Sequence, residues 1–260
     1  MRQSAFCPPG ASAVITGAGR GIGLATAVRL AGEGIYVIAC DLDADSVEST
    51  SAEIVSKGGL CFPVVADVTK MDDCQRVAQI AAASGYPLRG LVNNAAVGAF
   101  NMDVESTSLE DWEQIIATNL TSIFLMSKFC IPLMRESGGG VIVNVSSIHA
   151  FATSPGVAPY AAAKGGVLTL TRTMALDLAK DTIRVMALIP GAVDTPMLRS
   201  HAEREGMTLE ELGFPSSPNA IARIASPDEL AGPISFLLSR DATFMTGSAL
   251  IADGGILAKF

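Results

Sequence analysis

Tyr160 and Lys164 are four residues apart, with alanines at the three positions between them. On a helix this spacing puts both side chains on one face. A cation beside a phenol favours the phenolate, so Lys164 is expected to lower the pKa of Tyr160 from about 10 toward neutrality. Tyr160 could then act as a general acid/base. Ser147 lies 13 residues earlier, and its hydroxyl could hydrogen-bond a substrate oxygen. These three residues form the candidate catalytic set.

A glycine-rich loop separates the first short apolar run from a stretch whose apolar residues have helical spacing. Its pattern is GxxxGxG, on Gly17, Gly21 and Gly23. The common dinucleotide pattern GxGxxG is not matched, because Ile22 stands where its last glycine would be. Glycines allow positive φ and close backbone approach, and the N–H groups of a following helix attract anionic oxygens. Four glycines in seven residues favour a pyrophosphate cradle over a merely tight turn.

Two aspartates follow the next apolar runs. Asp41 ends the second run, 24 residues after the first loop glycine. A carboxylate there would accept hydrogen bonds from the adenosine ribose hydroxyls. Alternatively, Asp41 or Asp43 provides a helix cap or a first-turn charge. Asp67, followed by Val68, could bind the adenine edge or cap the helix after it, and both interpretations stay open.

Short β-branched runs alternate with longer Ala/Leu-rich stretches. Strands are expected at 13–16, 35–40, 60–65, from 91, at 141–145, 183–189 and 249–251, and helices at 21–33, 44–56, 71–83, 109–135, 158–179 and 227–238. Residues 194–226 look irregular, with charges at 203–211 on a solvated helix face. The alternation predicts an α/β fold: a single-domain, Rossmann-like, doubly wound parallel sheet of about seven strands, with helices on both faces. Residues 1–10 would be an N-terminal tail, and 11–260 one dinucleotide-binding and catalytic domain.

Composition narrows the function classes. The 260 residues are 49% hydrophobic and 17% charged, which excludes a mainly disordered chain. The net charge of −8 disfavours nucleic acid and anionic membranes as partners. Glycines and prolines break the uncharged stretch 137–163, so we expect no membrane span there. Residues 1–10 contain no apolar run of signal-peptide length, so we expect a cytoplasmic location. Five scattered cysteines without a CxxC pair, and two histidines 52 residues apart, predict neither disulfides nor a bound metal.

Several motifs, in this order and at this spacing, resemble the short-chain dehydrogenase/reductase family in its non-extended type, over roughly residues 11–255. The residues that carry the resemblance are Thr16, Gly17, Gly21, Gly23, Asp67, Val68, Asn93, Asn94, Ala95, Asn119, Ser147, Tyr160, Lys164, Pro190, Gly191, Thr195, Asp253, Gly254 and Gly255. Ala96 and Met186 depart from the family pattern, which more often has Gly and Asn there. These departures concern local packing and leave the Ser-Tyr-Lys set intact.

The resemblance implies roles for these residues. Tyr160 would exchange a proton with the alcohol or carbonyl oxygen, and Ser147 would orient that oxygen. Lys164 would hold the nicotinamide ribose, and Asn119 would hold a water that links Lys164 to solvent. From the motifs and the resemblance together, the expected cofactor-binding residues are Gly17, Arg20, Gly21, Ile22, Gly23, Asp41, Leu42, Asp67, Val68, Asn94, Ala95, Tyr160, Lys164, Pro190, Gly191, Val193 and Thr195. The segment at about 194–226 would cover the substrate.

The expected function is an NAD-dependent oxidoreductase that transfers a hydride between nicotinamide and a small-molecule secondary alcohol or ketone. NAD is favoured over NADP because the Asp41 carboxylate would repel a 2′-phosphate, whereas Arg20 favours NADP. The alternatives are an NADPH-dependent 3-oxoacyl-carrier-protein reductase and a non-catalytic dinucleotide-sensing interaction protein. The resemblance and the apolar tail 256–260 favour a homotetramer.

Two histidines and the expected pocket loops bear on the substrate. His149 is either a substrate-pocket residue or a loop histidine without a catalytic role, and the second is favoured. His201 lies in the covering segment, where Met197, Met207 and Phe214 could line a pocket or belong to the core. The loops 97–100 and 148–157 contain no Lys or Arg. Since only Arg199 and Arg204 could then bind an anion, a neutral or fairly apolar substrate is expected.

Overall fold

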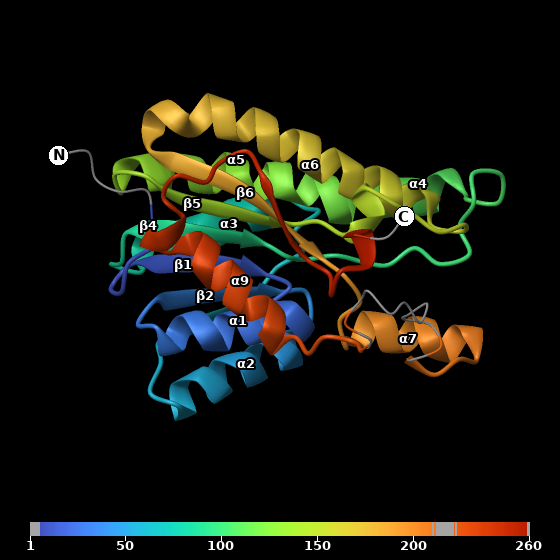
Figure 1. Ribbon diagram of the computed structural model, residues 1–260. Helices are drawn as coiled ribbons and strands as arrows, with labels where there is room; N and C mark the ends of the chain where they lie inside the picture. The colour runs from blue at the N-terminus through green and yellow to red at the C-terminus, as the bar shows by residue number, and fades with distance from the viewer. Residues whose placement is uncertain (1–5, 210, 212–220, 222, 259–260) are drawn as a thin grey trace.

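The structure, a computed structural model, describes residues 6–209, 211, 221 and 223–258. Seven parallel strands form one sheet in the order β3-β2-β1-β4-β5-β6-β7 (Figure 1). They are β1 (Ser12–Thr16), β2 (Tyr36–Asp41), β3 (Cys61–Val65), β4 (Leu88–Asn93), β5 (Gly140–Val145), β6 (Ile183–Pro190) and β7 (Ala249–Ala252). The predicted Rossmann-like α/β fold is confirmed, and the strand order reverses direction between β1 and β4.

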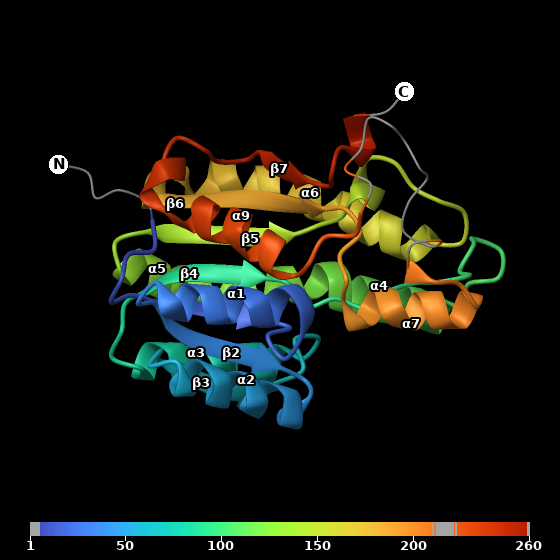
Figure 2. The ribbon, with the colours of Figure 1, turned by 60° about the horizontal axis from the view of Figure 1, so that its bottom comes forward.

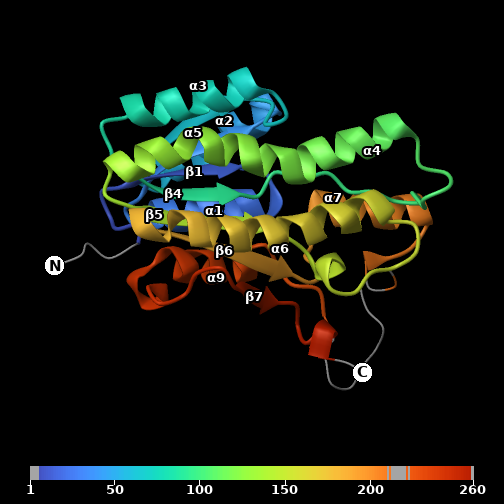
Figure 3. The same cartoon turned by 90° about the horizontal axis from the view of Figure 1, so that it is seen from above.

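Helices cover both faces of the sheet. On one face lie α1 (Gly21–Gly32), α2 (Ala44–Ser56) and α9 (Asp228–Leu238); on the other lie α3 (Met71–Ala83), α4 (Leu109–Ile116), α5 (Ser122–Glu136) and α6 (Ala158–Leu178), as Figure 1 and Figure 3 show. α7 (Pro196–Glu205) stands apart from both layers, at the carboxyl end of the strands (Figure 2). That end of the sheet is where open α/β folds place their ligands.

The central strands are buried along their whole length. Every residue of β1, β4, β5 and β6 is buried. A parallel strand with helices on both faces appears in the sequence as a continuous apolar run, which is why these strands were predictable. Apolar side chains pack on both sides of the sheet, around Leu30 and Ile234 on the α1 face and around Met126 and Leu178 on the α5 face. β3 forms an edge and exposes Phe62.

α7 corrects the prediction of irregular backbone at the start of 194–226. Thr195 caps the helix by accepting a hydrogen bond from a first-turn N–H, and Pro196 occupies the first helical position. Gly206 ends the helix in the left-handed region, with φ of +64°. Ala202 is the one buried residue of this helix, so apolar periodicity could not reveal it.

Parts of the predicted segments lie outside the described residues. These parts are 1–5 of the expected N-terminal tail, 259–260 of the apolar C-terminal tail, and 210, 212–220 and 222 of the covering segment. Phe214, named above as a pocket or core residue, belongs to this group. Within the described part, β4 begins at Leu88 rather than at 91.

The helix predicted over 109–135 contains a wider turn. A π-helical turn, Ala117–Thr121, joins α4 to α5 and includes Asn119. Such turns are frequent at functional sites. Among the described helices, the stretch Leu109–Glu136 is the one long and apolar enough to cross a membrane by length and composition, and half of its most apolar window is buried within the protein.

Candidate active site

The glycine-rich loop lies where the strand order reverses, between β1 and β4. Thr16, the last residue of β1, accepts hydrogen bonds at Oγ1 from the backbone N–H groups of Asn94 and Ala95, each at 3.0 Å. The Asn94 side-chain amide donates to the carbonyl oxygens of Thr16 and Gly17, at 3.0 and 3.1 Å. A Cβ on Gly17 would lie 2.8 Å from the Ala95 Cα. Asn94 and Ala95 therefore lie at the loop and fix its shape.

The loop backbone fits an anionic group. Gly17 and Gly21 have φ of +65° and +54°, which L side chains rarely adopt. α1 begins without a side-chain cap and without an acidic residue in its first turn. Its first N–H groups therefore stay available to the oxygens of a dinucleotide pyrophosphate. A Cβ on Gly23 would lie 1.9 Å from the Gly17 carbonyl oxygen, so only glycine lets the helix pass this close. Ile22, beside it, packs against the core.

Asp41 is the carboxylate next to this loop. It ends β2, is buried, and accepts hydrogen bonds from the backbone of Gly19 at 2.8 Å and of Asp43 at 3.1 Å. The alternative role of helix cap belongs to Asp43, whose side chain accepts from Ser46 N at 3.2 Å where α2 begins. Leu42 is exposed beside them. Asp41 is thus held at the loop, and its role toward a ribose stays a prediction.

Asp67 lies two residues beyond β3 and closes a turn there. Its Oδ1 accepts hydrogen bonds from the backbone N–H and the hydroxyl of Thr69, at 2.9 and 2.7 Å. α3 begins after Lys70, not after Asp67, so the proposed capping role of Asp67 is wrong. Val68 is buried among apolar core residues. The adenine-edge role of Asp67 stays a prediction.

The residues after β6 lie across from the loop. Pro190 ends β6, and Gly191 and the buried Val193 follow it. Thr195 caps α7, and a Cβ on Gly21 would lie 3.1 Å from the Thr195 Cγ2. The start of α7 therefore lies against the start of α1, so that two segments far apart in the sequence border one site.

Ser147, Tyr160 and Lys164 come together where β5 meets α6. Tyr160 and Lys164 lie in the first turns of α6. Lys164 Nζ donates to the carbonyl oxygen of Val145, the last residue of β5, at 2.9 Å, and lies 5.5 Å from the centroid of the Tyr160 ring. Ser147 is buried two residues after β5, and its side chain interacts with that of Tyr160. The structure thus groups the three residues, and their catalytic roles stay a prediction.

Burial shifts the pKa of both titratable groups of this cluster, Tyr160 and Lys164. Lys164 is almost fully buried, and burial lowers its pKa to about 8. Burial raises the pKa of Tyr160, and the Ser147 hydroxyl opposes that rise. The expectation that Lys164 brings the pKa of Tyr160 down toward neutrality is therefore corrected, because the cost of desolvating the phenolate is the larger effect.

Asn119 is fully buried in the π-helical turn. Its side-chain amide donates to the carbonyl oxygens of Val97 and Ile115, both at 3.0 Å. Its Oδ1 has no hydrogen-bond partner in the part of the chain that the structure describes. The amide ties the loop after β4 to the helix, and no described hydrogen bond joins Asn119 to Lys164. Its water-holding role therefore stays a prediction.

Two polar residues support the site in ways that the sequence did not reveal: Thr16 was named there only as part of the glycine motif, and Asn144 was not named at all. Thr16 anchors the glycine loop, as described above. Asn144 on β5 accepts a hydrogen bond from Asn93 on β4 at 2.8 Å and donates to Thr171 on α6 at 3.0 Å. This chain of hydrogen bonds joins both strands to the helix that carries Tyr160. The available signal was an asparagine at the end of the apolar run Leu91-Val92 and another within the apolar run of β5.

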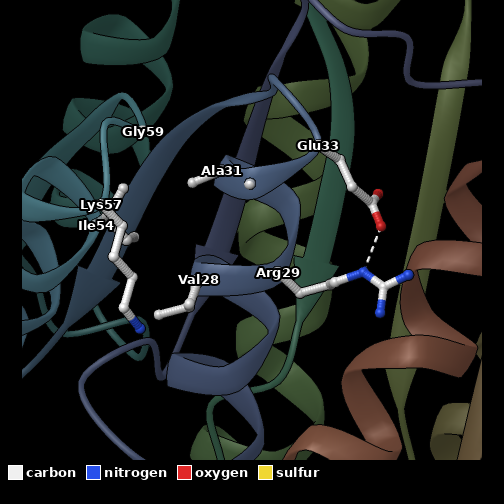
Figure 4. Close-up of a pocket in the computed structure, with 8 residues that line it drawn as sticks. Val28, Arg29, Ala31, Glu33, Ile54, Lys57 and Gly59 are labelled. Carbon is white, nitrogen blue, oxygen red and sulfur yellow. Dashed lines mark hydrogen bonds and ion pairs between the residues drawn. The ribbon is translucent and has the colours of Figure 1, made fainter.

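A hollow of about 390 Å³ opens elsewhere, between α1 and α2 (Figure 4). Val28, Arg29 and Glu33 line it from the second half of α1 and just beyond, and Lys57 lines it from the end of α2. This half of α1 lies at the edge where the strands begin, so the hollow is at the opposite edge from the site. Cys61 is partly exposed, the other four cysteines are buried, and all five are free. Among the described residues, no group of three or more His, Cys, Asp or Glu could hold a metal.

The chain is similar in sequence and in structure to known proteins. A family model described as short chain dehydrogenase matches residues 11–206. The cyclohexanol dehydrogenase of Acinetobacter sp. (strain SE19) is 34% identical over 247 residues, which cover 95% of each chain. The crystal structure of levodione reductase has a TM-score of 0.92 and 29% identity, covering 97% of this chain and 100% of that one.

A second solved structure contains a bound cofactor. It is described as an NAD(P) dependent gluconate 5-dehydrogenase from Beutenbergia cavernae, with NADP at low occupancy. Its TM-score is 0.86 and its identity 35%, over 98% of this chain and 100% of that one. The family model and these relatives span the same strands, glycine loop and helix α6 that build the site described above. The chain belongs to the short-chain dehydrogenase/reductase family of oxidoreductases, which bind a nicotinamide dinucleotide.

Proposed function

We propose that the protein is an NAD(H)-dependent oxidoreductase that interconverts a neutral secondary alcohol and its ketone. The observation that carries this proposal is the cluster of Ser147, Tyr160 and Lys164 at the end of β5. β5 is the neighbour of β4, whose end fixes the glycine loop. The bound nicotinamide would donate or accept the hydride. The chain itself would supply orientation and a proton.

The three side chains divide this work. The Ser147 hydroxyl would hydrogen-bond the reacting oxygen and hold it near the phenol. Burial raises the pKa of the Tyr160 phenol and so keeps it protonated, and the phenol would donate this proton to a ketone oxygen during reduction. During oxidation Tyr160 must take that proton, and the Lys164 cation assists by stabilising the phenolate. The Val145 carbonyl holds the Lys164 ammonium in place.

A neutral substrate is supported by the charges of α7. Arg199 donates two hydrogen bonds to the Asp194 carboxylate, at 2.6 and 2.8 Å, so its charge is already compensated. Arg204, the other cation on this helix, is exposed. An anionic substrate would need a guanidinium or ammonium close by. Since a relative is named for cyclohexanol, cyclic secondary alcohols are the first candidates.

The test is a substrate screen in which the change in nicotinamide absorbance measures turnover, with NAD and NADP tested in parallel. We expect oxidation of cyclic secondary alcohols and little turnover of carboxylate- or phosphate-bearing ones. A strong preference for β-ketoacyl thioesters with NADPH would instead favour the carrier-protein reductase. Dinucleotide binding without turnover across alcohols, polyols, sugars, hydroxysteroids and β-ketoesters would favour the sensing protein.

NAD is proposed over NADP because of Asp41. Its buried carboxylate would face the 2′-phosphate of NADP, a like-charge contact that costs several kcal/mol when desolvated. Arg20, the residue that favours NADP, is exposed. The pKa of Asp43 is lowered mainly by its hydrogen bonds with Ser46, and also by the charge of Arg20. Arg20 therefore has an acidic neighbour in this chain.

We expect the unmodified protein to use NAD at least about tenfold better than NADP in kcat/KM, which needs about 1.4 kcal/mol of discrimination. Asp41→Ser should narrow this ratio, chiefly by improving NADP. Asp45→Ser is the matched control, because it removes an exposed carboxylate from the same helix start and should leave the ratio within about twofold. Equal or better use of NADP by the unmodified protein would show that Asp41 does not meet the ribose.

A homotetramer of D₂ symmetry is proposed from the apolar side chains on adjacent helices. Leu109 and Phe124 on the α4–α5 stretch are 71% and 51% exposed, and Leu176 on α6 is 81% exposed. Isologous contacts of these helices with their symmetry mates would cover them. Light scattering at micromolar concentration should give the mass of four 26.8 kDa chains, and Leu176→Glu should give smaller assemblies. A monomeric unmodified protein would contradict this proposal. The cytoplasmic location also stays a prediction.

A further inference from the structure

His149 lies beside the proposed acid/base. Its ring meets the Tyr160 ring edge to face, with centroids 5.8 Å apart and planes at 83°. Its backbone N–H donates to Ser147 Oγ at 3.3 Å. The imidazole therefore borders the place where an oxygen held by Ser147 and Tyr160 would lie.

The orientation of this imidazole is fixed from one side. His149 Nδ1 lies 3.1 Å from the Thr153 hydroxyl, and the contact with Tyr160 restricts ring rotation. The second ring nitrogen, Nε2, has no hydrogen-bond partner among the described residues. A ring held at one nitrogen and open at the other is prepared to bind a polar group of a ligand.

The surroundings keep His149 neutral. Burial is the main cause that lowers its pKa, and the nearby His201 on α7 adds to this effect. The His201 ring already packs against another side chain, because it stacks on the Phe100 ring with centroids 3.9 Å apart. A neutral imidazole offers one donor or acceptor at Nε2 and no charge, so it suits a hydroxyl or keto oxygen rather than a carboxylate.

We propose that His149 determines substrate specificity by hydrogen-bonding, through Nε2, a second neutral oxygen of the substrate. The preferred substrates would then be secondary alcohols that carry a further hydroxyl or keto group a few bonds from the reacting carbon. This inference rests on the proposed function and replaces the sequence-based preference for a loop histidine without a role. A site built to hydrogen-bond a substrate hydroxyl discriminates against analogues that lack it.

The contacts of Thr153 favour a hydroxyl over a keto group. Thr153 Oγ1 lies 3.4 Å from the Ser154 carbonyl oxygen and can donate its one hydrogen there. His149 Nδ1 must then donate to Thr153, which leaves Nε2 as an acceptor. An acceptor binds a substrate hydroxyl, so diols should be preferred over hydroxyketones.

The test compares kcat/KM for cyclohexanol with that for cyclohexane-1,2-diol, -1,3-diol and -1,4-diol, with NAD. For at least one diol, kcat/KM should be about ten times that for cyclohexanol, which is the change expected from one neutral hydrogen bond. This quotient is called the diol ratio. His149→Phe keeps the aromatic contact with Tyr160 and removes the ring nitrogens, so the ratio should fall about tenfold. His149→Gln, which keeps a hydrogen-bonding group, should restore part of it. No preference for any diol, or the same ratio in His149→Phe, would overturn the proposal.

Two further variants test the geometry. Thr153→Val removes the partner of Nδ1 and should lower the diol ratio partway, because the ring loses its fixed orientation. His201→Gln removes the other imidazole and should leave the ratio within about twofold. If His201→Gln lowered the ratio as much as His149→Phe, the specificity would belong to α7 and not to His149.

Binding can be followed without turnover. The chain has two histidines, so nuclear magnetic resonance of ¹³C-labelled histidine gives two ring signals, and His149→Gln identifies which one is His149. In the presence of NADH, which cannot accept a hydride from an alcohol, the preferred diol should shift the His149 signal and cyclohexanol should not. A shift without oxidation of any alcohol would support this inference while the proposed function fails. Oxidation without a shift would overturn this inference alone.

Discussion

Tyr160→Phe is expected to lower kcat by about 10²–10⁴-fold, the usual contribution of a positioned acid/base. The substitution keeps the aromatic ring and removes only the hydroxyl. The edge contact with His149 and the packing beside Lys164 are therefore retained. What is lost is the proton that must move to or from the reacting oxygen. Initial rates of NAD reduction with the best alcohol of the substrate screen measure the effect.

Three measurements separate this loss from structural damage. Titration calorimetry should show dinucleotide affinity within about twofold of the unmodified protein, and thermal unfolding should show a similar Tm. Phe151→Leu, a change at an exposed aromatic residue nearby, controls for disturbance of the loop after β5. Near-normal turnover by Tyr160→Phe, with normal cofactor binding, would remove Tyr160 from the proposed chemistry.

The sequence was sufficient for the strands and for the grouping of the catalytic candidates. Parallel strands buried on both faces leave apolar runs, and the runs at 13–16 and 141–145 coincide with β1 and β5 to within one residue. Tyr160 and Lys164 were paired because four-residue spacing on a helix is a local property. Ser147 could be placed because it follows a strand whose carboxyl end must face the same edge of the sheet.

What the sequence could not supply depends on contacts between distant segments. The link between Asn93 and Asn144 follows from strand pairing, in which the two residues stand opposite each other. α7 is mostly polar, so only its caps signal a helix. The pKa of Tyr160 depends on how deeply the ring is buried, which a four-residue spacing does not reveal. The role proposed for His149 likewise needs the contact between its ring and Tyr160.

Lys164→Met is expected to lower turnover by at least about 10²-fold, because it removes the cation that stabilises the phenolate. It should also leave the Tm at pH 7 equal to or above that of the unmodified protein. Methionine is similar in length and carries no charge, so the variant avoids burying an ammonium group. Thermal unfolding between pH 7 and 10.5 measures the stability, and Lys180→Met, at an exposed lysine, is the matched control.

The sign of the pH dependence follows from the pKa of Lys164. Burial lowers that pKa from 10.5 to about 8 in the folded state. Below pH 8 Lys164 is protonated in both the folded and the unfolded state. The folded state then carries the full free-energy cost of burying the cation, on the order of 3 kcal/mol at 1.36 kcal/mol per pKa unit. Between pH 8 and 10.5 the unfolded state binds more protons, so this contribution to the free energy of unfolding becomes more favourable as pH rises.

The stability advantage of Lys164→Met should therefore be largest near pH 7 and shrink as pH approaches 10.5, whereas Lys180→Met should show no such trend. If the Tm of Lys164→Met instead lay several degrees below that of the unmodified protein, equally at pH 7 and at pH 10, the ammonium would stabilise the fold through its hydrogen bond to Val145. In the expected outcome, the chain retains at this position a cation that lowers its stability. A destabilising residue is kept when activity requires it, and Lys164 would meet that condition through its position 5.5 Å from the Tyr160 ring.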